Sequence, residues 1–312
     1  MSKKNVVFIL VLSLVLSLTA CGKKSNITPE NEGNKAPNSA DITDDTPEES
    51  NDTDTDSKEL PKDSEPVSDS DASVDNPSEN FSSEMATEEN AVKADDGTEV
   101  FTSLISYPEV NIPSNEYAQM SVNDFFAARV ASWKEEEAQI GSDALESYEY
   151  AKESEDDYFM PYFYQVIGSE ENTAKGLYSV LMTYNYFTGG AHPNSFYEGY
   201  NFDLSTGELL DIGEIASDED SFRDFLINTL ITDIKEGKNM GSDLTEDLFF
   251  EDYADSIRNT INGTPLWYTT KDSLVICFNT YEIAPYVAGP IFFDIPWNDC
   301  KDYLSDDFKK GL

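Results

Sequence analysis

The stretch from residue 121 to residue 140, SVNDFFAARVASWKEEEAQI, predicts a long amphipathic helix. Its larger side chains recur every three to four residues, so they share one face of a helix. That face comprises Val122, Phe125, Phe126, Arg129, Val130 and Trp133. Ser121 precedes the pattern as a candidate N-cap, and a charged continuation extends the helix to about residue 155.

Strand-like segments lie on both sides of this helix, at residues 102–112, 157–168 and 176–187. The last alternates regularly and predicts a sheet face lined by Tyr178, Tyr184 and Tyr186. Strands and helices come in clusters rather than in a regular βαβ alternation. The sequence therefore predicts an α+β fold of antiparallel sheets with packed helices.

The second half repeats this mixture of elements. Residues 195–210 read as a hairpin that turns at residues 205–207, and residues 218–237 read as a helix ended by Gly237. A weaker helix at 245–261 precedes strands at 265–270 and 273–280. We expect an N-terminal part of strand and long helix at residues 99–190, and a C-terminal part of sheet and helices at residues 191–312.

The N-terminus is typical of an export signal. Lys3 and Lys4 precede an apolar run at residues 6–18, which is shorter than the about 20 residues that a spanning helix needs. The run ends at Leu18-Thr19-Ala20-Cys21, the pattern of a bacterial lipoprotein signal, which predicts a signal over residues 1–21 and a lipid on Cys21. An ordinary signal peptide with an incidental cysteine is the alternative. The lipid would hold the protein on the extracytoplasmic face of the cell membrane.

Residues 22–98 are rich in Asp, Glu, Ser, Thr, Asn and Pro and poor in large apolar residues. Such a segment buries too little apolar surface to offset its ordering entropy, so the sequence predicts a disordered acidic linker. Residues 22–96 hold 22 acidic residues and 6 lysines, a net charge of −16. The linker would act as a tether between the membrane and a folded part.

The folded part is itself strongly acidic. Removing the −16 of residues 22–96 and the +2 of Lys3 and Lys4 from the −42 of the whole chain leaves −28. This charge excludes nucleic acid and other polyanions as expected partners, and it favours a cationic one. Cys277 and Cys300 show no metal-binding spacing, and two unpaired, half-buried thiols are favoured over a disulfide between them.

Two loops attract attention as candidate sites. The first holds His192, the only histidine, between Gly189-Gly190-Ala191 and Pro193. One histidine supplies no His₂ or His₃ metal set, and the chain contains no HExxH, GxSxG, GxGxxG or Walker motif. Three roles are possible for His192: a structural turn, a contact with a ligand and, least favoured, catalysis. We expect no metal, no cofactor and no enzyme activity.

The second loop is YEIAPYVAGP, residues 281–290. Its two prolines and one glycine stiffen it, and its tyrosines Tyr281 and Tyr286 are the kind of low-entropy side chain that interfaces use. The alternative is that both tyrosines stack on the sheet of the same domain.

Three stretches carry a family resemblance: YFTGGAHPNS (186–195), YNFDLSTGELLDIGEI (200–215) and SLVICFNTYEIAPYVAGPIFFDIPW (273–297). They resemble the extracytoplasmic domain of the lysozyme-sensing anti-sigma factor RsiV, which is also the non-catalytic N-terminal region of the peptidoglycan deacetylase PdaC. The resemblance covers about residues 102–304. It implies an α+β fold and a domain that binds lysozyme, a small cationic protein. The implied contact residues are His192, Pro193, Asn194, Ser195, Pro285 and Tyr286.

These observations lead to one main hypothesis and two alternatives. The main one is a lipid-anchored, non-catalytic module that captures a cationic extracellular protein such as lysozyme. The first alternative is a module for cell-wall glycan, in which the tyrosine-lined face stacks on sugars. The second is a cell-envelope hydrolase that uses a carboxylate pair.

Overall fold

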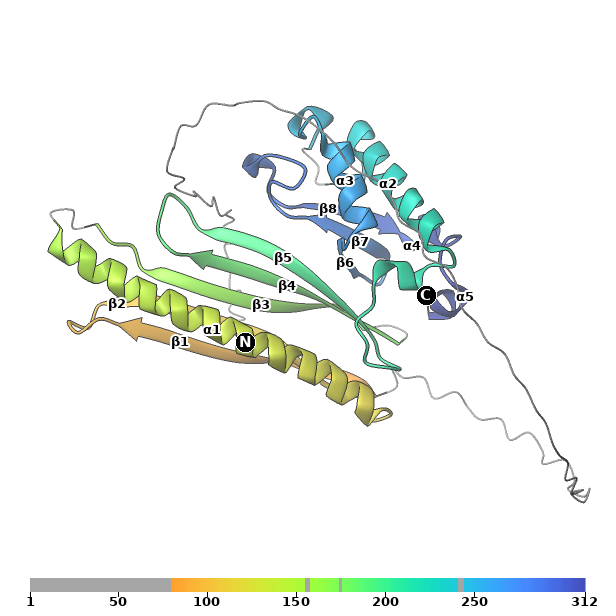
Figure 1. Cartoon of the computed structure of the whole chain (residues 1–312). Helices are drawn as coiled ribbons and strands as arrows, with labels where there is room; N and C mark the ends of the chain where they lie inside the picture. Colours follow the sequence, from red (N-terminus) through yellow and green to blue (C-terminus); the bar gives the residue numbers. More distant parts are fainter. Residues whose placement is uncertain (1–79, 155–157, 174–175, 241–243, 312) are drawn as a thin grey trace, which may run out of the picture. The chain divides into compact units, whose positions relative to one another are not determined.

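Five strands form the larger sheet of this computed structural model, which describes residues 80–154, 158–173, 176–240 and 244–311 (Figure 1). In their order across the sheet they are β1 (Ser82–Lys93), β2 (Glu99–Asn111), β3 (Tyr162–Asn172), β4 (Leu177–Phe187) and β5 (Asn194–Asp203). The pair β2/β3 is parallel and the other three pairs are antiparallel. The expected α+β class is confirmed. The larger sheet departs from the expected antiparallel arrangement at this one pair, because a helix crosses over between β2 and β3 and returns the chain in the same direction.

That crossover is the predicted long helix, α1 (Glu116–Glu153). It starts six residues earlier than expected, because the side chain of Asn115 accepts a hydrogen bond from the Ala118 N–H at 3.1 Å. The expected cap, Ser121, lies inside the helix and donates to the Gly207 carbonyl at 2.9 Å. The face that α1 buries against the sheet comprises Ala118, Val122, Phe126, Val130, Trp133, Gly141 and Ala144.

Strand β1 corrects the expected linker boundary. Its sequence, SSEMATEENAVK, is polar and its side chains are exposed or half-buried, yet it pairs with β2 over its whole length from Ser82↔Asn111 to Lys93↔Glu99. The predicted linker therefore ends before residue 82 and not at residue 98. The signal, Cys21 and residues 22–79 of the linker lie outside the described residues.

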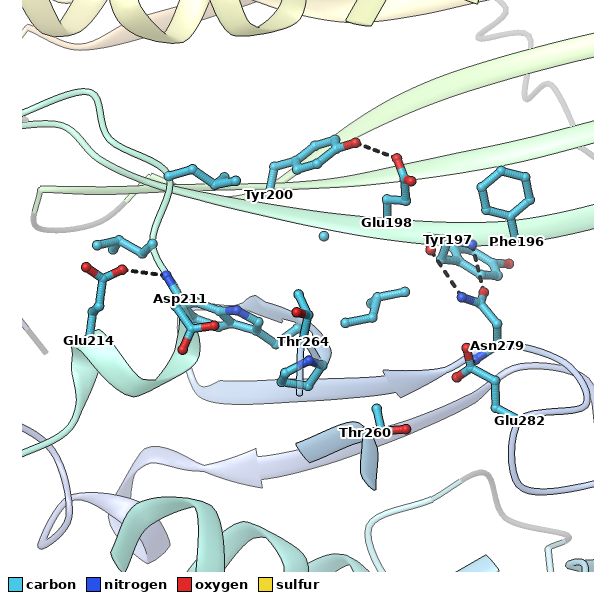
Figure 2. A pocket seen from close by; sticks show the side chains of 16 residues that line it. Phe196, Tyr197, Glu198, Tyr200, Asp211, Glu214, Thr260, Thr264, Asn279 and Glu282 are labelled. Carbon is cyan, nitrogen blue, oxygen red and sulfur yellow. Dashed lines mark hydrogen bonds between the residues drawn. The ribbon is translucent and has the colours of Figure 1, made fainter. Parts of the chain in front are cut away.

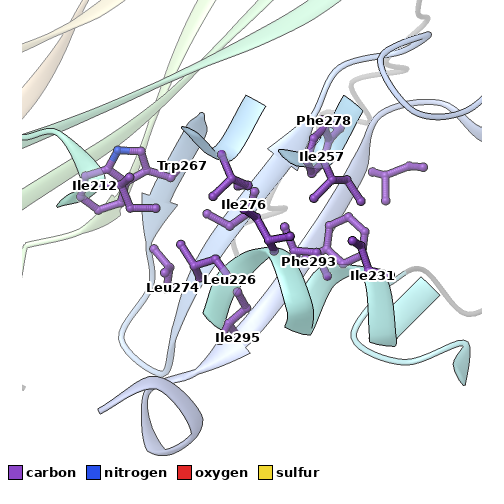
Figure 3. Close-up of a cluster of buried hydrophobic side chains, with 14 of the residues drawn as sticks. Ile212, Leu226, Ile231, Ile257, Trp267, Leu274, Ile276, Phe278, Phe293 and Ile295 are labelled. Atoms are coloured by element: carbon purple, nitrogen blue, oxygen red, sulfur yellow. The ribbon is translucent and has the colours of Figure 1, made fainter. Parts of the chain in front are cut away.

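The smaller sheet is antiparallel and consists of β6 (Leu266–Thr269), β7 (Ser273–Phe278) and β8 (Ile291–Pro296). Helices α2 (Glu219–Glu236) and α3 (Tyr253–Asn262) cover one of its faces (Figure 1). Helix α2 ends at Gly237 as expected, because this glycine adopts the left-handed conformation at φ 65°. The side chains that Figure 3 labels in this core are Ile212, Leu226, Ile231, Ile257, Trp267, Leu274, Ile276, Phe278, Phe293 and Ile295.

Short helical segments complete the described chain: η1 (Ile212–Ile215), η2 (Glu246–Leu248), η3 (Tyr286–Ala288), α4 (Trp297–Cys300) and α5 (Asp306–Gly311). None of the helices in the described segments has the length and apolar character needed to cross a membrane. Cys277 in β7 and Cys300 in α4 are unpaired, as expected, but they are fully buried rather than half-buried. Burial raises the pKa of both thiols, to about 12 for Cys300.

The two sheets meet where β6 crosses the end of the larger sheet. The Asn201 side chain donates to the Trp267 carbonyl at 2.9 Å, and the Thr269 N–H donates to the Ser179 hydroxyl at 2.9 Å. Gly199 permits this approach, because a Cβ there would lie 2.1 Å from the Trp267 oxygen. Strand β5 belongs to the larger sheet, so the expected division at residue 190 is wrong and the change of sheet follows Asp203.

Candidate functional site

The loop that carries His192 connects β4 to β5. Gly189 and Gly190 both have positive φ, at 90° and 97°, which an L-residue rarely adopts. A Cβ at Gly189 would lie 3.0 Å from the Tyr162 hydroxyl. These two glycines therefore set a sharp turn that leaves the His192 side chain exposed.

The second loop follows β7 and begins with a strained residue. Tyr281 has φ 73°, a left-handed conformation that is uncommon for a residue other than glycine and costs free energy. A turn holds it in place: the Glu282 N–H donates to the Asn279 carbonyl at 3.1 Å, and the Asn279 N–H donates to the Glu282 side chain at 2.8 Å. The chain then passes Pro285 into η3, which ends at Gly289 with φ 67°.

The two loops, far apart in the sequence, come together. The His192 ring stacks on the Tyr286 ring with centroids 5.1 Å apart and planes 29° apart. The Tyr281 ring lies 6.1 Å from the Tyr286 ring and is 46% exposed. Val287, beside them in the chain, is 80% exposed. We call His192, Tyr281, Tyr286 and Val287 the two-loop surface. Tyr286 is half-buried and the other three are exposed, and such apolar and aromatic groups mark binding sites.

The second loop is anchored to the larger sheet by one side chain. The Asn279 carboxamide accepts a hydrogen bond from the Tyr197 N–H at 2.8 Å and donates one to the Tyr197 carbonyl at 3.2 Å. It thereby makes both bonds that a neighbouring strand would make to β5 at this position. The loop that holds Tyr286 is thus fixed relative to the strand that follows His192.

The other predicted contact residues lie around or below this surface. Pro193 and Pro285 are half-buried at the exits of their loops. Asn194 and Ser195 are only 5% and 4% exposed, because they already belong to β5 and pair with Tyr186 and Asn185 of β4. The expected strand began at Ser195, one residue later than observed, since strand boundaries are the least certain part of such a prediction.

The neighbours of His192 determine which chemical roles its side chain could have. Its contact within the described residues is the stack on Tyr286, and no serine, cysteine or carboxylate there forms a hydrogen bond with it. No group of three or more His, Cys, Asp or Glu residues in the described chain is arranged to hold a metal ion. The arrangement presents a surface for contact and builds no pair of nucleophile and general base there.

The tyrosine-lined face of β4 is not available as a sugar platform. Tyr184 is 2% exposed and stacks on Phe196 at 4.2 Å, with the edge of Trp133 from α1 packed against it. Tyr178 is fully buried, and Tyr186 is half-buried. The face expected to stack on glycan is instead core, because α1 covers it.

A cavity of about 590 Å³ opens beside the two-loop surface, between the free edge of β5 and the chain around β6 (Figure 2). Its walls include Tyr200, Gly199 and Trp267. Four carboxylates also line it: Glu198, Asp211, Glu214 and Glu282. The sequence does not reveal this site, because acidic residues are so abundant in the chain that no four of them stand out.

Most of these carboxylates are held by neighbours. Glu198 accepts from Arg129 at 2.6 Å and also from the hydroxyls of Tyr184 and Tyr200. Burial of the Tyr200 hydroxyl is the main cause that raises its pKa, and the Glu198 carboxylate raises the pKa further.

The Asp211 side chain pairs with Arg223 at 2.6 Å and accepts from the Gly213 N–H at 2.8 Å. The Glu214 side chain accepts from the Asp211 N–H at 2.6 Å and so completes a capping box around η1. These bonds fix the position of the wall that faces β5.

Comparison with known proteins gives two family matches. Residues 94–195 match the family described as Deacetylase PdaC, and residues 214–298 match the family described as Protein of unknown function (DUF3298). A search of curated proteins finds no match.

Two solved structures are similar to this chain. One is a member of the DUF3298 family from Bacteroides fragilis, with a TM-score of 0.56 and 20% identity, covering 73% of this chain and 95% of the other. The second is a DUF3298 family protein from Pseudomonas aeruginosa, with a TM-score of 0.45 and 13% identity, covering 73% and 96%. The first similarity supports the α+β fold. The two family models match separate parts of the chain, and both agree with the family resemblance of the sequence.

Proposed function

We propose that this protein is a lipid-anchored binding module that captures a cationic extracellular protein on its two-loop surface, with lysozyme as the candidate, and that it catalyses no reaction. The observation that carries the proposal is the stack of His192 on Tyr286. This stack joins the two loops into one aromatic group. The left-handed backbone of Tyr281 costs conformational free energy, and strained residues of this kind are concentrated at binding sites.

The charge of the protein supports a cationic partner. The chain beyond residue 96 carries −28, and the carboxylates beside the two-loop surface add to the local negative potential. Such a field accelerates the encounter with a cationic protein and repels polyanions. The aromatic side chains would then supply the specific, desolvated contact.

A pull-down with lysozyme tests this function. We expect the full chain to bind, and we expect affinity to fall when salt rises from about 20 mM to about 300 mM, because screening weakens the attraction. Tyr286→Ala should weaken binding at least about tenfold, as the loss of a central aromatic anchor does. Tyr117→Ala is the matched control, since this tyrosine is 69% exposed at the start of α1, outside the two-loop surface. An equal effect of both variants, or no binding at low salt, would refute the proposal.

The anchor is tested separately. If Cys21 carries the lipid, Cys21→Ala should release the protein from the membrane fraction, and incorporation of labelled fatty acid should be lost. Retention of the variant in membranes, with unchanged labelling, would show that the anchor lies elsewhere. This experiment leaves the two-loop surface untouched, so its outcome is independent of the pull-down.

A further inference from the structure

The free edge of β5 contains a gap one residue wide. In an antiparallel pair, alternate residues direct their N–H and C=O away from the partner strand. Tyr197 directs both groups outward to Asn279, and Asn201 directs its carbonyl outward to the Leu210 N–H at 2.7 Å. Gly199 lies between these two positions, so its N–H and C=O also point outward from β4.

Nothing in the described chain fills that gap. Asn279 occupies the edge at Tyr197 and Leu210 occupies it at Asn201, but no hydrogen bond from a described residue reaches the outward N–H or C=O of Gly199. Gly199 lines the cavity between β5 and β6. The cavity therefore offers one main-chain donor and one main-chain acceptor, which together match a single residue of an added strand.

The negative charge of the cavity favours an added strand with basic side chains. No lysine, arginine or histidine is among the described residues that line it. Arg129 and Arg223 pair with Glu198 and Asp211 from outside the lining, whereas no described cation pairs with Glu214 or Glu282. Glu282 lies toward one end of the cavity and Glu214 toward the other (Figure 2).

The remaining walls suit the stems of basic side chains. Leu209, Pro265, Leu266 and Trp267 supply apolar surface between the charged ends. Lysine and arginine bury their methylene stems along such surface while the charged group stays with its partner. A volume of about 590 Å³ is also that of an ordinary ligand site.

We propose that this cavity binds an extended basic peptide segment, in which one residue pairs through its main chain with Gly199 and the flanking cationic side chains reach Glu282 and Glu214. This site is distinct from the two-loop surface, and the proposal stands whether or not lysozyme is the partner of that surface. A polyanion, an acidic peptide or a neutral peptide lacks the charge that the two carboxylates require.

Binding is measured with the peptide Ac-Lys-Ala-Lys-NHMe and the full chain labelled with ¹⁵N-glycine. The chain contains 16 glycines, and carbonyl labelling of glutamate narrows the assignment to three Glu–Gly pairs that include Glu198–Gly199. We expect the Gly199 amide resonance to move on titration. No movement up to about 20 mM peptide, beyond the millimolar range expected of so small a contact, would overturn the proposal.

Two modified peptides separate charge from main-chain pairing. Replacing both lysines by norleucine should weaken binding at least about tenfold, the effect of losing one hydrogen bond to a charged group. N-methylation of the central alanine should weaken it similarly, because the donor to the Gly199 carbonyl is lost. Equal binding of all three peptides would refute a site of this kind.

Protein variants complete the test. The double variant Glu214→Gln with Glu282→Gln keeps an acceptor oxygen at both positions and removes two charges. It should lower the affinity for the lysine peptide at least about fivefold. Glu135→Gln with Glu146→Gln makes the same change of net charge on exposed positions of α1, outside the cavity lining. If both double variants weaken binding equally, the effect is one of net charge and the proposed site is wrong. Loss of lysozyme binding in Tyr286→Ala without loss of peptide binding would separate the two sites.

Discussion

Replacing Gly199 by alanine tests how the two sheets are joined. A Cβ at this position would lie 2.1 Å from the Trp267 carbonyl oxygen and 2.9 Å from its carbonyl carbon. Both are main-chain atoms of β6, which no rotamer change can move. Relieving the overlap requires β6 to withdraw from β5 by roughly 1 Å, given that real Cβ contacts are essentially never shorter than 3.0 Å.

The cost follows from the bonds that this movement loosens. Overpacking of a close contact costs about 1 to 3 kcal/mol. The bonds from Asn201 to the Trp267 carbonyl and from Thr269 to Ser179 lie at the same seam, and each contributes about 1 kcal/mol. Alanine restricts the unfolded chain and returns about 0.4 to 1 kcal/mol. We expect Gly199→Ala to lower the free energy of unfolding by about 2 to 4 kcal/mol.

Equilibrium unfolding in urea, followed by tryptophan fluorescence, measures this change. Gly141→Ala is the matched control: it is also buried, but its Cβ would meet the side chains of Val92 and Phe101 at 3.2 and 3.3 Å, which can yield. Alanine gains about 1 kcal/mol of helix propensity there, so we expect a net change within about 1 kcal/mol. A loss below about 1 kcal/mol for Gly199→Ala would refute the account of the seam.

Three further predictions concern charge and thiols. Hydrogen bonds from Thr98 and Tyr148, with Lys152 nearby, lower the pKa of Asp96 in the folded protein. The stability that the ionised Asp96 contributes should be complete above about pH 5 and should be lost as the pH falls below the pKa of about 3.9 that Asp has in the unfolded chain. Asp96→Asn should therefore flatten that part of the curve of unfolding free energy against pH, measured in urea. Arg129→Ala should lower the free energy of unfolding in urea by about 1 to 2 kcal/mol, because its side chain is only 35% exposed and its guanidinium lies near the rings of Trp133 and Tyr200. Lys134→Ala, which removes a more exposed ion pair, should lower it by less than about 0.5 kcal/mol, and equal losses would contradict this. The thiols of Cys277 and Cys300 should react with a thiol reagent at pH 8 only after unfolding, and rapid labelling of either residue in the native protein would contradict their burial.

The elements with strong periodicity were predictable from the sequence, and those held by long-range pairing were not. Helix α2 has an apolar face and a terminal Gly237, so its pattern and its end agree. Strand β1 has no apolar face, and it is a strand because the main chain of β2 pairs with it. The Asp96-Gly97 turn that joins β1 to β2 was the one local signal of this hairpin. The composition of β1 matched that of the linker before it, which is why the boundary was placed too late.

The candidate site was predictable only in pieces. The glycines around His192 and the prolines and tyrosines of the second loop marked two rigid loops, but their contact depends on how β4, β5 and β7 are arranged. The gap at Gly199 could not be predicted from the sequence, because it consists of a main-chain N–H and C=O, which nearly every residue has. Only the positions of Asn279 and Leu210 reveal that these groups lack a partner.

The edge position of β1 determines how the protein responds to mechanical force. Any pull on the chain that precedes Ser82 enters the fold through a strand bonded on one side only, to β2. Tension along the strand axis loads all of its inter-strand bonds in shear at once, whereas tension across the axis opens them one after another from Ser82↔Asn111. The direction of traction, rather than its size alone, thus decides whether the domain yields gradually or resists as a unit.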